Sequence, residues 1–157
     1  MVNTFWGILG NIPIRAAFFG WLLAQFLKVP IYYSLSGKVE WRRILSSGGM
    51  PSSHSSAICA TTASIGMIEG FHSSTFALAV VMSAVVMFDA AGVRRATGKH
   101  AALLNEIVEI LRGQKELTDA RLKEWIGHTP FEVFVGMWIG LITGIITTLI
   151  SVKPVAL

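Results

Sequence analysis

The chain has 157 residues, of which 53% are hydrophobic and only 14% are charged, and its mean hydropathy is +0.61. Soluble domains carry about 25% charged residues, so this composition excludes an ordinary soluble protein and predicts one domain, residues 1–157, embedded in a membrane. The formal net charge is +4, but the basic residues lie mainly between apolar segments. This distribution is typical of membrane topology rather than of nucleic-acid binding.

Four apolar stretches are predicted to form transmembrane helices: Pro13–Tyr33, Ser55–Gly70, Thr75–Val93 and Phe131–Val152. The last is a clean run of about 20 residues, enough to cross about 30 Å of hydrocarbon. The second is short and rich in small residues, which favours packing among other helices. The predicted fold is therefore an all-α integral membrane bundle of about four transmembrane helices. Val2–Ile12 is too short to cross and is expected to be interfacial or re-entrant.

A polar segment between the third and fourth apolar stretches carries one further helical pattern. Apolar residues recur at helical spacing over Ala101–Leu111, with charged residues on the other side. The pattern predicts an amphipathic helix that lies on the membrane surface or caps the bundle.

Simple alternation of the four stretches brings the polar residues of the chain to one face of the membrane. His54, Asp89, Arg94, Arg95 and His128 all lie at stretch ends that share this face. The same face carries most of the lysines and arginines, and basic residues favour the cytoplasmic side. We therefore expect a cytoplasmic site.

Two histidines stand at predicted helix starts. The first follows a flexible loop, Gly48-Gly49-Met50-Pro51-Ser52-Ser53-His54. Glycines allow a backbone to approach a ligand closely, and the free N–H groups of a helix start bind phosphate. The competing interpretation is ordinary helix capping beside an incidental histidine.

The second histidine, His128, is followed one helical turn later by Glu132. In one interpretation Glu132 accepts a hydrogen bond from the imidazole, leaving the other ring nitrogen free to attack phosphorus. In the other, Thr129 and Glu132 form a capping box. Arg94 and Arg95 offer donors suited to phosphate oxygens or anchor the chain at the membrane. Asp89 is expected to pair with one of these arginines or to hold His54.

These motifs resemble those of the type 2 phosphatidic acid phosphatase and vanadium haloperoxidase superfamily. Pro51-Ser52-Ser53-His54 is similar to its central motif, and His128 with Glu132, Val133 and Gly136 is similar to its last. The whole chain, with Asp89-Ala90-Ala91-Gly92-Val93-Arg94-Arg95, resembles the divergent bacterial and plastid branch. That resemblance implies a bacterial inner membrane or a plastid-type membrane.

The resemblance also implies a role for each residue. His128 would be the nucleophile, Glu132 would orient it, and His54 would protonate the leaving oxygen. Ser53 would bind the phosphoryl group, Arg94 or Arg95 would supply the last motif's arginine, and Lys38 with Arg42 would supply the first motif's cations. His100 follows Arg94 at the superfamily's spacing, but Leu104 stands where its carboxylate should be, so His128 is preferred.

The resulting prediction is a membrane phosphatase that needs no metal or cofactor and acts on a lipid phosphomonoester or diphosphate. Phosphatidylglycerol phosphate, phosphatidic acid and polyprenyl diphosphate all fit. The alternatives are a non-catalytic membrane protein that keeps the phosphate pocket, and a phosphatase of soluble esters. The short second stretch is compatible with a homodimer.

Overall fold

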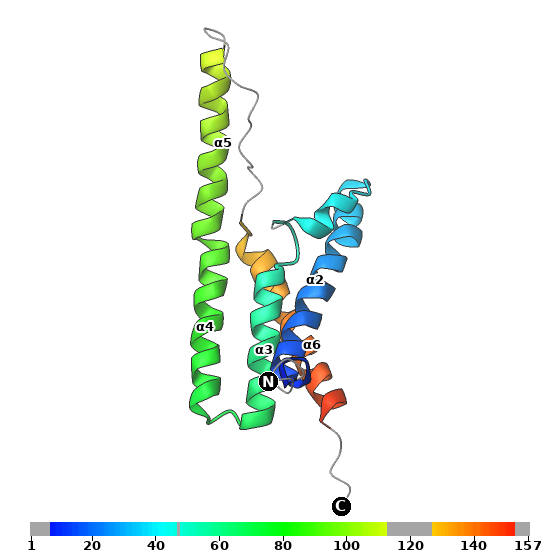
Figure 1. Cartoon of the computed structure of the whole chain (residues 1–157). Coiled ribbons are helices and arrows are strands. Elements are labelled where there is room, and N and C mark those ends of the chain that lie inside the picture. The colour runs from blue at the N-terminus through cyan, green and yellow to red at the C-terminus, as the bar shows by residue number, and fades with distance from the viewer. Residues whose placement is uncertain (1–6, 47, 113–126, 153–157) are drawn as a thin grey trace, which may run out of the picture.

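Helices make up all regular structure in the described part of the chain, which is residues 7–46, 48–112 and 127–152 of the computed structural model (Figure 1). The long helices are α2 (Ile12–Ser36), α3 (Ser53–Glu69), α4 (Ser74–Ala91), α5 (Val93–Arg112) and α6 (Pro130–Ser151). A short 3-10 helix, η1, covers Trp41–Leu45. The predicted all-α class is confirmed. Residues 7–10 are also helical, but most of the Val2–Ile12 segment lies outside the described residues.

Polar caps fix where four of these helices begin. Each cap is a residue whose side chain accepts a hydrogen bond from a backbone N–H of the first turn, and the caps are Asn11, Ser52, Ser73 and Thr129. Such caps satisfy donors that a helix start leaves unpaired. The four predicted apolar stretches therefore begin within two residues of the observed helices.

Helix α3 lies at the centre of the bundle, in contact with α2, α4 and α6. Glycines at positions 136, 140 and 144 let α6 rest directly on it, because a Cβ atom on Gly140 would collide with the carbonyl oxygen of Ser56. The Ser56 hydroxyl in turn donates to the carbonyl of Gly20 in α2 at 2.7 Å. Small residues thus bring three backbones together around α3, as its composition predicted.

Helices α4 and α5 form one nearly continuous rod, and α5 rises beyond the ends of the other helices (Figure 1). The predicted amphipathic helix over Ala101–Leu111 is part of α5, which starts eight residues earlier. Apart from the contact of Arg94, at its start, with His54 in α3, α5 packs only against α4 among the described elements. The prediction that this helix caps the bundle is therefore wrong.

Among the residues that the structure describes, three helical stretches are long and apolar enough to cross a membrane: Ile12–Ser36, Ser74–Ile110 and Pro130–Ser151. Helix α3 has only 17 residues, which is short for a crossing of about 20 residues. The expected count of about four spans is not confirmed. The described helices place the start of α3, the end of α4 and the start of α6 at the same end of the bundle (Figure 1).

Candidate active site

His128 is held directly before α6. Its backbone N–H donates to the carbonyl oxygen of Ala90 in α4 at 3.0 Å, and its side chain is fully buried. Nδ1 of the ring lies 3.3 Å from Oε2 of Glu132. A carboxylate only accepts hydrogen bonds, so Nδ1 carries the hydrogen in this contact. The lone pair of the neutral ring is then on Nε2, which makes no hydrogen bond to any described residue.

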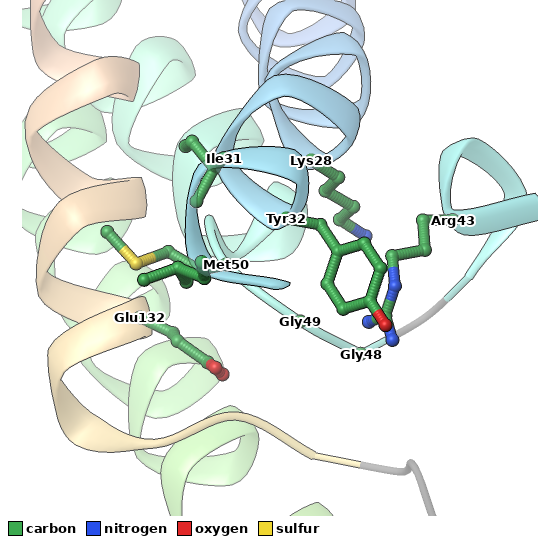
Figure 2. Close-up of a pocket in the computed structure, with 9 residues that line it drawn as sticks. Lys28, Ile31, Tyr32, Arg43, Gly48, Gly49, Met50 and Glu132 are labelled. Carbon is green, nitrogen blue, oxygen red and sulfur yellow. The ribbon is translucent and has the colours of Figure 1, made fainter. Parts of the chain in front are cut away.

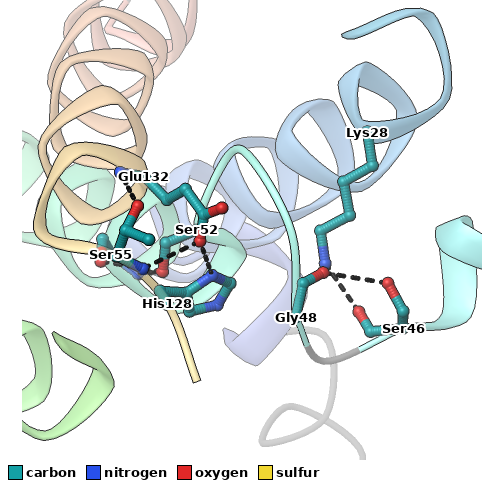
Figure 3. Close-up of polar contacts among 8 residues, drawn as sticks. Lys28, Ser46, Gly48, Ser52, Ser55, His128 and Glu132 are labelled. Carbon is teal, nitrogen blue, oxygen red and sulfur yellow. Dashed lines mark hydrogen bonds and ion pairs between the residues drawn. The ribbon is translucent and has the colours of Figure 1, made fainter. Parts of the chain in front are cut away.

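The same carboxylate oxygen completes a capping box. Oε2 of Glu132 accepts from the backbone N–H of Thr129 at 3.0 Å, and the N–H of Glu132 donates to Oγ1 of Thr129 at 3.3 Å. The two interpretations that the sequence set against each other therefore coexist. The helix cap fixes the carboxylate in the position from which it contacts the imidazole (Figure 3).

His54 lies in the first turn of α3 and contacts an arginine from the start of α5. Nε2 of His54 is 3.2 Å from a terminal nitrogen of Arg94. A guanidinium only donates, so Nε2 accepts, and the hydrogen of the neutral ring is on Nδ1. Burial is the main reason why the pKa of His54 is lowered, and the positive charge of Arg94 lowers it further.

Arg94 is itself positioned by Asp89. Its Nε donates to Oδ2 of Asp89 at 2.7 Å across the junction of α4 and α5. Of the two partners expected for Asp89, the structure therefore shows the arginine. Arg95 is exposed, so Arg94 is the one of the pair that reaches the imidazole of His54.

The two histidine rings lie edge to face within this cluster. Their centroids are 6.5 Å apart and their planes meet at 61°. The structure thus brings together His54, Asp89, Arg94 and His128 from three separate segments, as the alternation of apolar stretches indicated. By contrast, His100 is exposed on α5.

Backbone contacts tie the loop before α3 to the start of α6. The N–H of Ser52 donates to the carbonyl oxygen of Glu132 at 3.1 Å. The N–H groups of Ser55 and Ser56 are bonded to the Oγ and carbonyl oxygen of Ser52. Ser53 is buried as the first residue of α3, where an α-helix leaves its own N–H without an intrahelical partner.

Lys28 is a cation that the sequence analysis did not place in the site. It comes from α2, is 2% exposed, and its Nζ donates to the carbonyl oxygen of Ser46 at 2.6 Å (Figure 3). A lysine inside an apolar stretch is costly unless it has a partner or a function, so its presence within Pro13–Tyr33 was the available signal.

Lys28 lines a small pocket of about 130 Å³ together with Arg43 and Glu132 (Figure 2). The guanidinium of Arg43 lies 3.6 Å from the ring centre of Tyr32, which also lines the pocket, as do Gly48, Gly49 and Met50. Lys38 and Arg42, the cations proposed from the first motif, are exposed. The geometry therefore favours Lys28 and Arg43 as the cations nearest to Glu132.

Two further observations concern the extent of the pocket and the possibility of a metal site. Neither His54 nor His128 is among the described residues that line the pocket. Within residues 7–46, 48–112 and 127–152 there is also no group of three or more histidine, cysteine, aspartate or glutamate residues arranged to bind a metal ion.

Comparison with known proteins identifies the family of this chain. The model of a family described as the divergent PAP2 family matches residues 9–143, which include both histidines and Arg94. The chain belongs to this family. A Bacillus subtilis (strain 168) relative, described as the uncharacterized membrane protein YuiD, is 37% identical over 154 residues, covering 91% of this chain and 95% of that protein. No solved structure matches the chain significantly.

Membership of the divergent PAP2 family places the chain in a phosphatase-like superfamily. The membrane-protein relative and the three long apolar helices together identify an integral membrane protein.

Proposed function

We propose that the protein is a membrane phosphatase that hydrolyses a phosphomonoester or diphosphate of a lipid through a phosphohistidine on His128. One observation carries the proposal. Glu132 holds Nδ1 of His128, so the lone pair is on Nε2, and the ring of His54 lies 6.5 Å away on the other side of the cluster. A nucleophile oriented by a carboxylate and close to a second histidine has the parts needed for covalent phosphoryl transfer.

In this proposal, hydrolysis takes place in two steps. First, substrate phosphate draws Arg94 away from Nε2 of His54, and His54 takes up a proton there. Nε2 of His128 then attacks phosphorus, the bond from phosphorus to the lipid oxygen breaks, and His54 gives its proton to that oxygen. Second, water attacks the phosphohistidine, and His54 takes the water's proton as inorganic phosphate leaves. Both histidines are then restored to the states they had before His128 attacked phosphorus.

Arg94 and the backbone N–H of Ser53 supply positive electrostatic potential on the α3 side of the rings. Lys28 supplies it on the side of Glu132, with Arg43 beside it in the small pocket. Such donors stabilise the negative charge that develops on the phosphoryl oxygens. Because the side chain of His128 is fully buried, substrate must displace part of the surrounding chain to reach Nε2.

The position of the cluster supports a lipid substrate. It lies at the junction of α4 and α5 and at the start of α6, within or beside two of the described stretches that are long and apolar enough to cross a membrane. A site at the mouth of such a bundle would meet phosphate groups that are already anchored at the membrane surface.

One observation favours a second candidate function. The complete burial of His128, together with exposed Lys38 and Arg42 in the first-motif segment, also suits a non-catalytic pocket that binds a lipid phosphate. This alternative predicts phosphate binding without release of inorganic phosphate.

The deciding experiment measures phosphate release by purified protein from a panel of lipid phosphates and from a water-soluble aryl phosphate. We expect turnover of a lipid substrate that His128→Ala abolishes. His54→Ala should lose about 100- to 10,000-fold on lipid substrates, and less on the aryl phosphate, whose leaving group needs less protonation. Lipid binding without turnover would support the non-catalytic pocket, and activity on the soluble ester alone would exclude a lipid substrate.

A further inference from the structure

The outward side of α4 and α5 carries an apolar stripe that no described element covers. It consists of Leu78, Val81, Val85, Phe88, Leu103, Ile107 and Ile110, each more than half exposed. These positions, with exposed Gly92, Ala96 and His100 between them, follow one another at intervals of three or four residues. They therefore lie on one side of the rod, which we call the outer stripe.

The bilayer accounts for only the first part of the outer stripe. Helix α4 has 18 residues, or about 27 Å at 1.5 Å per residue, which nearly fills the hydrocarbon core of about 30 Å. Leu103 lies about 18 Å beyond the end of α4 by the same measure. The stripe on α5 thus leaves the membrane if the rod stays straight.

The candidate active site keeps the rod straight. The salt bridge from Arg94 to Asp89 spans Gly92, and Arg94 also contacts His54. Gly127 packs so tightly on the backbone of Arg94 and Arg95 that an added Cβ would collide with it. Laying α5 flat on the membrane would require a sharp bend at Gly92 and would break these contacts.

The opposite side of α5 differs from the outer stripe in its exposure. Gly98 and Ala101 are buried, and at 100° per residue they point away from Leu103 and Ile107. The outer stripe of α5 is therefore an exposed apolar face beyond the membrane, over which no described element lies. Such a face marks an interaction surface.

The spacing on α5 identifies a helix as the occupant. Leu103, Ile107 and Ile110 are four and then three residues apart, the spacing of the core positions of a coiled coil, and Ala96 with His100 continues it towards the membrane. The flanking positions that would face each other in a parallel pair hold Lys99 and Glu106 on one side and Thr97 and Leu104 on the other. No like charges would meet there.

From this arrangement we propose that the protein is a parallel homodimer, in which the outer stripe of α5 packs against the same stripe of a second copy. Two copies inserted in the same membrane with the same orientation present α5 in parallel and at the same height. Helix α5 has 20 residues, short for an independent coiled coil, but anchoring in one membrane raises the effective concentration of the partner. The proposal does not depend on catalysis.

Disulfide cross-linking of full-length protein in native membranes tests this pairing. In a Cys59→Ala background, Leu103→Cys, Ile107→Cys and Ile110→Cys should each give a dimer after oxidation, detected on a non-reducing gel. Ala102→Cys, exposed on the other side of α5, is the matched control and should stay monomeric. Equal cross-linking at position 102, or none along the stripe, would overturn the proposal.

Two further measurements separate the possible occupants. Ile107→Asp should convert the detergent-solubilised dimer to a monomer by light scattering, with helicity retained by circular dichroism, whereas Ala102→Asp should remain dimeric. A fluorophore at position 107 that is quenched by nitroxide-labelled lipid would instead place the stripe on the bilayer and refute the dimer. If Ile107→Asp fails to accumulate, the cysteine series alone decides.

Discussion

Oε2 of Glu132 accepts hydrogen bonds from two donors of different kinds. One is the backbone N–H of Thr129, which caps α6, and the other is Nδ1 of His128. Helix capping and imidazole orientation use the same atom, so the fold itself delivers the carboxylate to the histidine. A substitution that keeps the cap but removes the charge separates the two roles.

We expect Glu132→Gln to preserve the fold and to lose catalysis. Glutamine still serves a capping box, so thermal stability should stay near that of the unsubstituted protein. Without the carboxylate charge the tautomer and cationic form of His128 are no longer favoured, and turnover should fall by about 10⁴-fold, as in a neutralised catalytic triad. Phosphate release and thermal unfolding measured together provide the test. Unchanged turnover would leave Glu132 as a cap alone.

The sequence motifs pointed to both histidines of the cluster, whereas the cations predicted from the first motif are exposed in the structure. His54 and His128 could be identified because each stands at a predicted helix start, where free backbone N–H groups bind phosphate. Lys38 and Arg42 were chosen from the polar loop after the first apolar stretch, and both are exposed. Lys28 reaches the site from inside α2, because Ser46 and residues 48–50 lie against that helix. The spacing of residues along the sequence does not predict this contact between the segment before α3 and α2.

We expect Lys28 and Lys38 to differ in their contribution to kcat/KM. Lys28→Met should lower kcat/KM by about 10²- to 10³-fold, the loss seen when one donor to a developing anion is removed. Lys38→Met removes the same charge from an exposed position and should leave steady-state kinetics unchanged. The reverse pattern would return the first-motif role to Lys38.

Helices made of continuous apolar residues could be predicted from the sequence. Helix α5, whose first residues are polar, could be predicted less well. Caps at Ser52, Ser73 and Thr129 set clear starts. The start of α5 was missed by eight residues because Arg94, Arg95 and Lys99 conceal its periodicity before Ala101. The close packing of α3 on α6 was visible only as an abundance of small residues. The structure shows that Gly136, Gly140 and Gly144 allow this close packing.

We expect Gly140→Ala to weaken the bundle. Its Cβ would collide with the backbone of Ser56, which cannot move without disturbing α3 below His54. Overpacking of this kind costs about 1–3 kcal/mol, and a lower unfolding temperature in detergent should report it. Gly10→Ala is the matched control, because a Cβ at Gly10 meets no heavy atom within 4 Å. Equal stability of the two variants would show that α6 has room to shift.

At the scale of the whole molecule, the site depends on which helix ends share one face. Alternating direction along the apolar stretches was enough to predict that His54, Asp89, Arg94 and His128 converge, since α3 and α4 form a tight hairpin between Glu69 and Ser74. The number of crossings was less certain from composition, because α3 is short and polar for a membrane helix. The direction of α3 in the bundle, rather than its hydropathy, determines at which end His54 lies.

The orientation of this face is the last prediction. Lys38, Arg42, Arg95 and Lys99 are exposed at the end of the bundle that carries the site, and an excess of basic residues favours the cytoplasmic side. In a Cys59→Ala background, His72→Cys, in the α3–α4 hairpin, should therefore react with a membrane-impermeant maleimide in intact cells. Lys99→Cys should react only after permeabilisation. The opposite pattern would place the site outside the cytoplasm, and labelling of both positions in intact cells would show that α4 does not cross the membrane.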